Sequence, residues 1–133
     1  MYKATEDIPY QERPALADSE NCQAYVEVHH DALFQNGLKT KAEFRAVSGF
    51  SIWYSVRNPY SENARDLGIE VGRELLKQGF FPKKAYESVG WAKAESLNEG
   101  VFTRTGNAND LHVLIKPNIP SIIIEVGVIQ NPY

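Results

Sequence analysis

The chain has 133 residues, a length that fits one domain with a single hydrophobic core. Its net charge of -3 gives no basic surface for nucleic acid, and its apolar runs are too short to span a bilayer. The single cysteine, Cys22, excludes an internal disulfide, and the polar N-terminus lacks the apolar core of an export signal. We expect one domain over residues 1–133, without repeats or linkers, and we expect a monomer.

The N-terminal third contains one predicted helix and one predicted strand. Residues 12–21 predict a short helix, because Pro14 suits a first helical turn and Ala-Leu-Ala follows it. Residues 24–29 alternate Tyr and Glu against two Val residues and predict a strand that ends at His-His-Asp. Residues 32–48 show no sustained period and predict a long loop, a feature that is usually functional or mobile in a compact domain.

The middle of the chain contains the clearest helix. Residues 49–55 are alternating and aromatic and predict a second strand, which Asn-Pro then breaks. Residues 61–78 predict a helix with Ser61 as N-cap and Gly79 as C-cap. Residues 85–97 could form a further helix. The long helix should pack on a sheet through one apolar stripe, formed by Ala64, Leu67, Gly68, Val71 and Leu75.

The C-terminal part predicts the strand around which the fold is organised. Residues 111–115, Leu-His-Val-Leu-Ile, predict a short apolar strand. Residues 120–127 follow as Pro-Ser-Ile-Ile-Ile-Glu-Val-Gly, and three consecutive isoleucines are typical of a strand buried on both faces. Strands separated by helices or long connections predict an α/β fold with an open, largely parallel sheet flanked by helices.

One carboxylate interrupts this apolar strand. Glu125 lies near its carboxyl end, where open α/β sheets bind their ligands. Stripping water from an ionised carboxylate is costly unless another group pairs with it. Two interpretations stay open: the carboxylate is held by a buried arginine or by backbone amides, or it is a general base or metal ligand.

The three histidines are not equivalent. His29 and His30 are neighbours on a strand, so they point to opposite faces and cannot both bind one ion. A catalytic zinc usually takes three protein ligands and a water. If the strands that carry His29 and Glu125 are parallel, these two residues lie at the same edge of the sheet. Asp31, two residues after His29, could share its side. His112 falls near the start of its predicted strand, at the opposite edge, and is expected to be structural.

Four pieces of the sequence, the first of them in two parts, match a family pattern in order. Residues 13–18 and 24–32 are similar to an Arg followed by Ala-Asn and to a strand ending Ser-Ile-His-Ala-Asn-Ala. Residues 49–55 resemble Gly-Phe-Glu-Val-Tyr-Tyr-Ser, and residues 111–114 resemble a Leu-x-Val-Leu strand. Residues 120–132 resemble Pro-Ala-Val-Leu-Val-Glu-Leu-Gly-Phe-Leu-Ser-Asn-Pro. These patterns belong to the zinc-dependent N-acetylmuramoyl-L-alanine amidases of the Amidase_3 type, which the chain therefore resembles.

The resemblance implies a reaction, a cofactor and a location. The family hydrolyses the amide between the lactyl group of N-acetylmuramic acid and L-alanine in peptidoglycan, with Zn²⁺ as cofactor. A zinc-bound water is the nucleophile, because the metal lowers its pKa and polarises the scissile carbonyl. By position, His29 would be a zinc ligand and Glu125 the catalytic acid/base. Peptidoglycan would be the partner, and the location would be the periplasm or the extracellular cell wall.

The chain also departs from the family pattern. The family's other two zinc ligands, a His in a Gly-His-Gly-Gly turn and a downstream Glu, have no counterpart here and would lie before Met1. We therefore expect the family's first strand and helix and its terminal helix to be missing, leaving an incomplete amidase domain with weak zinc binding and little activity. The alternative is a degenerate relative that binds cell-wall glycopeptide or a partner protein. A carboxypeptidase-like α/β zinc hydrolase is a third interpretation, which the Gly-Phe-x-x-Trp-Tyr-Ser strand disfavours.

Overall fold

The structure, a computed structural model, describes residues 8–31, 48–83, 92–104 and 111–128. Almost all of the predicted loop at residues 32–48 lies outside these ranges. The described helices and strands are α1 (Arg13–Ser19), β1 (Tyr25–Asp31), β2 (Ser51–Ser55), α3 (Ser61–Lys77), β3 (Ala92–Ser96), β4 (Val101–Arg104), α4 (His112–Ile115) and β5 (Ser121–Val128).

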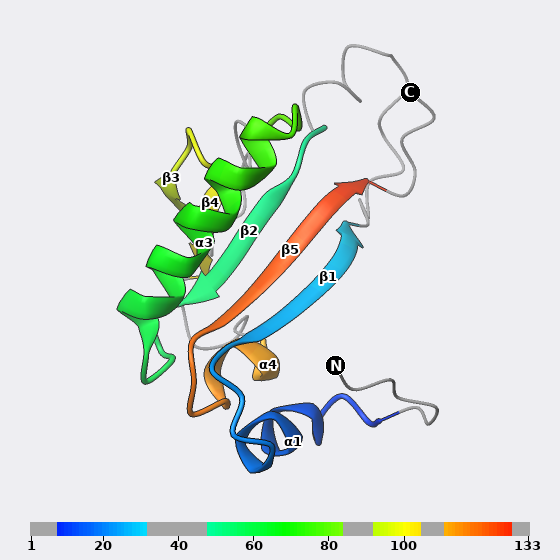
Figure 1. Cartoon of the computed structure of the whole chain (residues 1–133), viewed down its shortest axis with the longest axis vertical. Helices are drawn as coiled ribbons and strands as arrows, with labels where there is room; N and C mark the ends of the chain where they lie inside the picture. Colours follow the sequence, from blue (N-terminus) through cyan, green and yellow to red (C-terminus); the bar gives the residue numbers. More distant parts are fainter. Residues whose placement is uncertain (1–7, 32–47, 84–91, 105–110, 129–133) are drawn as a thin grey trace.

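The described strands form one open sheet in the order β1-β5-β2-β4-β3 (Figure 1). β1 pairs with β5, and β2 with β4, in the parallel sense. β5 pairs with β2, and β4 with β3, in the antiparallel sense. The predicted open α/β sheet is confirmed, and it is mixed, because half of these pairings are antiparallel. The isoleucine-rich β5 has a neighbouring strand on each side, as its sequence predicted.

One face of the sheet is covered by α3, which packs on β2, β4 and β5 (Figure 1). The predicted helix is confirmed, but its N-cap is Tyr60 and not Ser61. Gly79 follows the helix with φ of +87°, a conformation that glycine adopts without strain. The stripe residues Leu67, Val71 and Leu75 pack on a buried cluster that comprises Phe50, Ile52, Tyr54, Ala64, Val101 and Ile122.

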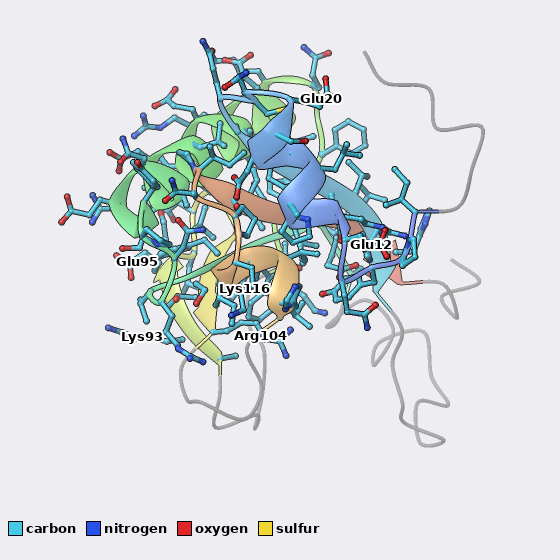
Figure 2. All side chains as sticks on the ribbon, turned by 90° about the horizontal axis from the view of Figure 1, so that it is seen from below. Glu12, Glu20, Lys93, Glu95, Arg104 and Lys116 are labelled. Carbon is cyan, nitrogen blue, oxygen red and sulfur yellow. The ribbon has the colours of Figure 1, made fainter. Side chains whose placement is uncertain are left out.

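The opposite face carries a second core cluster, because successive side chains of a strand point to opposite faces. Trp53 and Phe102 stack with ring centroids 5.2 Å apart, and Trp53 Nε1 donates to Ser51 Oγ at 3.1 Å. α4 supplies Val113 and Leu114, both fully buried, to the same cluster. α1 and α4 lie at the end of the sheet where β1 and β5 begin (Figures 1 and 2).

Two secondary-structure predictions are wrong. Residues 111–115 contain the helix α4 and no strand, because so short an apolar run fits either periodicity and two adjacent residues here enter the core. Residues 92–96, part of the helix predicted over 85–97, form β3, which pairs with the unpredicted β4. Their Ala, Lys and Glu residues favour a helix, but the pairing with β4 prevails. Residues 84–91 lie outside the described residues.

On β1 the side chain of Glu27 is buried, whereas the valine side chains on the other face are exposed. Glu27 is only 8% exposed, whereas Val26 and Val28 are 47% and 64% exposed. Together with Val126, which is 42% exposed, these residues form a valine patch on the sheet face that carries α3. No described strand pairs with the outer edge of β1. None of the described helices is long and apolar enough to cross a membrane.

Candidate active site

The parallel pairing of β1 and β5 brings the two predicted site residues together. His29 and Glu125 are register partners, and both lie towards the carboxyl ends of their strands. Neighbouring strands lie about 4.8 Å apart, and register partners point to the same face of a sheet. The predicted proximity at a common edge is therefore confirmed, while the chemical role of each residue stays a prediction.

Glu125 lies between two strands at this edge. Its register partner on β2 is Ser51, which is fully buried. The Oε2 atom of Glu125 is buried and accepts no hydrogen bond, although the residue makes another interaction. A carboxylate oxygen that is shielded from solvent has the chemistry that a general base or a metal ligand requires.

His29 has a second carboxylate neighbour, which the sequence analysis missed. Its Nε2 lies 2.9 Å from Oε2 of Glu27, on the same strand and the same face. The His29 side chain is 42% exposed, whereas that of Glu27 is 8% exposed. The imidazole is thus accessible from solvent, while the carboxylate behind it is buried. The signal in the sequence was a Glu two residues before a strand-end His, a spacing that puts both side chains on one face.

Glu27 is itself held by two further donors. Its Oε1 accepts hydrogen bonds from Arg13 Nη1 at 3.1 Å and from the Tyr25 hydroxyl at 2.5 Å. Arg13, in the first turn of α1, also donates through Nε to the carbonyl of Ile8 at 3.2 Å. Burial, and then the hydrogen bond to Glu27, raise the pKa of Tyr25 above its ordinary value, so its hydroxyl stays a donor.

The other two histidines are not register partners of Glu125. His30 follows His29 directly on β1, and its orientation towards the opposite face stays a prediction from strand alternation. His112 lies on α4, where Nε2 is 3.3 Å from the carbonyl of Gln11, so it joins α4 to the N-terminal segment. The register of β1 against β5 shifts between His29 and Asp31.

The described residues fit part of a zinc site. An imidazole and a carboxylate are both groups that zinc takes as ligands, and His29 and Glu125 supply one of each. Among the residues that the structure describes, no cluster of three or more His, Cys, Asp or Glu side chains could hold a metal ion. Any further ligands would therefore come from outside the described residues.

Comparisons with solved structures give the same fold. The N-acetylmuramyl-L-alanine amidase Ami1 from Mycobacterium smegmatis is similar with a TM-score of 0.61 at 25% identity, over 92% of this chain and 47% of that one. The N-acetylmuramoyl-L-alanine amidase from Clostridium difficile 630 has a TM-score of 0.62 at 21% identity, over 94% and 51%. AmiC2 of Nostoc punctiforme, also an N-acetylmuramoyl-L-alanine amidase, has a TM-score of 0.56 at 19% identity, over 99% and 55%.

The chain spans about half the length of these solved relatives. A comparison with curated proteins gave no match. The family model of Amidase_3, described as N-acetylmuramoyl-L-alanine amidase, matches residues 1–133, which is the whole chain. The chain therefore belongs to the Amidase_3 family.

Proposed function

We propose that this chain acts in the hydrolysis of the amide between the lactyl group of N-acetylmuramic acid and L-alanine in peptidoglycan. Membership of the family supports the reaction class. The observation that carries the proposal is the pairing of His29 with Glu125 at the carboxyl ends of two adjacent parallel strands. This pairing supports the assignment of a metal ligand and a general base to one site.

The two residues have different roles in this proposal. His29 binds Zn²⁺ through a ring nitrogen. When bound, zinc supplies a Lewis acid that polarises the scissile carbonyl and acidifies water. Glu125 accepts a proton from the attacking water and returns it to the leaving amine of L-alanine. Its place on the apolar strand β5 supports this role, because the Oε2 atom of Glu125 is shielded from solvent there.

The proposal extends to location and assembly. Peptidoglycan lies outside the cytoplasmic membrane, so the site of action is the periplasm or the extracellular cell wall. We propose that the chain works as a monomer on this polymer.

A second candidate function is a non-catalytic module that binds cell-wall glycopeptide or a partner protein. The observation in its favour is that the described residues hold no cluster of three metal-ligating side chains. Such a module would use the same sheet edge for binding and would carry out no chemistry.

Zinc calorimetry on the 133-residue chain tests the metal assignment. We expect zinc binding to the wild type, its loss in His29→Ala, and its retention in the control variant His112→Ala, since His112 lies on α4. Zinc binding that survives in His29→Ala would refute the ligand assignment.

Muropeptide cleavage separates the two functions. With zinc supplied, we expect slow release of the peptide that begins with L-alanine, and a further fall of about 100-fold or more in Glu125→Gln with zinc still bound. Loss of zinc from Glu125→Gln would make Glu125 a ligand. Tight muropeptide binding without cleavage, at saturating zinc, would favour the binding module.

A further inference from the structure

The two oxygens of Glu27 have separate partners. Oε1 accepts from Arg13 and Tyr25, while Oε2 is the atom that faces His29 Nε2 at 2.9 Å. The donors to Oε1 come from two different elements, α1 and the start of β1. Because the carboxylate is nearly excluded from solvent, these charge-assisted bonds fix its position.

A fixed carboxylate at this position selects one form of the imidazole. An ionised carboxylate only accepts hydrogen bonds, so the nitrogen that faces it must carry a proton. A neutral imidazole has one N–H donor and one acceptor nitrogen. With Nε2 protonated towards Glu27, Nδ1 of His29 is the nitrogen that has a lone pair to offer.

We propose that Glu27 is the positioning residue of this site: it holds the imidazole of His29 with Nε2 protonated and leaves Nδ1 for the metal. The inference rests on the proposed function for the metal and on the contacts of Glu27 for the orientation. Metal-ligating histidines commonly donate their other ring N–H to a carboxylate, which sets the tautomer and orients the ring. The Ser-Ile-His pattern compared above has a serine at the place of Glu27, so the carboxylate is a feature of this chain.

Glu27 matters for the orientation of His29 because the His29 side chain is exposed while that of Glu27 is buried. The His29 ring is 42% exposed, so protein packing alone leaves it freedom to rotate. The carboxylate behind it is anchored through Arg13, whose Nε is bonded in turn to the Ile8 carbonyl. The order of the ring thus comes from its contact with the anchored Glu27 carboxylate and not from its own burial.

Nitrogen NMR of the metal-free chain tests the orientation directly. The spectrum is recorded at mildly alkaline pH. We expect a single Nε2–H tautomer for His29 in the wild type and in Glu27→Gln, whose amide oxygen still accepts. We expect a mixture in Glu27→Ala, similar to that of the exposed His30, which serves as an internal control.

Zinc calorimetry on the same variants gives a second readout. We expect Glu27→Ala to weaken zinc binding by about 10- to 100-fold, and Glu27→Gln to weaken it less. The matched control is Glu70→Ala, which removes another carboxylate paired with an arginine, on the surface of α3. This variant should bind zinc as the wild type does.

The outcomes separate the two proposals. A tautomer population of His29 that is the same in the wild type and Glu27→Ala, or zinc affinity that Glu27→Ala leaves unchanged, would overturn the positioning role. A single Nε2–H tautomer that depends on Glu27, in a chain that binds no zinc, would support the orientation of His29 and refute the zinc proposal.

Discussion

Two glycines on α3 give a sharp test of how closely the helix packs on the sheet. Gly68 and Gly72 lie one helical turn apart, and both are buried. In a helix, Ala is favoured over Gly by about 1 kcal/mol, so each Gly→Ala change contributes the same gain in helix propensity to the free energy of unfolding. The two sites differ in what the added methyl group would meet.

At Gly72 the new Cβ would lie 2.2 Å from the carbonyl oxygen of Glu99 and 2.9 Å from its Cβ. The obstacle is backbone, so α3 or the turn before β4 must move. Overpacking of this kind costs about 3 kcal/mol at the upper end of the usual range. Set against the propensity gain of about 1 kcal/mol, Gly72→Ala should lower the free energy of unfolding by about 2 kcal/mol.

At Gly68 the nearest atoms are side-chain methyl groups, 3.2 Å away on Ile52 and 3.6 Å away on Val101. They need to move only a few tenths of an ångström. Gly68→Ala should therefore leave stability unchanged or raise it by up to about 1 kcal/mol.

Urea unfolding, followed through the fluorescence of the buried Trp53, measures both changes. For a chain of this size, thermal midpoints should fall by about 6 °C for Gly72→Ala and rise by 0 to about 3 °C for Gly68→Ala. A Gly72→Ala variant as stable as Gly68→Ala would refute the close approach of α3 to Glu99.

Two other predictions concern buried polar groups. Asn58 is 3% exposed and donates through Nδ2 to the carbonyls of Leu114, Pro117 and Ile119. Asn58→Ala should therefore lower the free energy of unfolding, measured in urea, by about 2–3 kcal/mol, and a loss below about 0.5 kcal/mol would contradict this. Burial raises the pKa of Tyr25 in the folded state above its ordinary 10.0, so the unfolded chain loses this proton first and stability falls as pH rises above 10. In Tyr25→Phe the fall above pH 10.0 should be shallower, and an identical slope would show that Tyr25 does not contribute.

The elements that could be predicted from the sequence are those with a long or strong pattern. α3 repeats its apolar residues over several turns, and β5 has three consecutive isoleucines between two turn signals. These patterns predict the same helix or strand whichever element packs against it, because one face of the helix or both faces of the strand must be buried. α4 and β3 have no such pattern, because each is short. Packing on the second core cluster makes α4 a helix, and pairing with β4 makes β3 a strand.

The site could be predicted in part for a similar reason. His29 and Glu125 follow from strand ends and parallel pairing, which chain order suggests. Glu27 could not be assigned from its own strand, because alternation says which residues share a face but not which face is buried. Its burial depends on Arg13, which reaches it from α1, 14 residues earlier in the chain.

The outer edge of β1 has a consequence for any stability measured on this chain. None of the strands that the structure describes pairs with this edge, and the valine patch lies beside it. A strand edge of this kind offers its backbone N–H and C=O groups to a further strand. Covering the three valines, each about half exposed, would contribute on the order of 2 kcal/mol before any new hydrogen bonds. A strand or partner that binds this edge of the folded chain stabilises the folded state. The free energy of unfolding of the isolated chain is therefore a lower limit, and it increases as more of the edge is occupied.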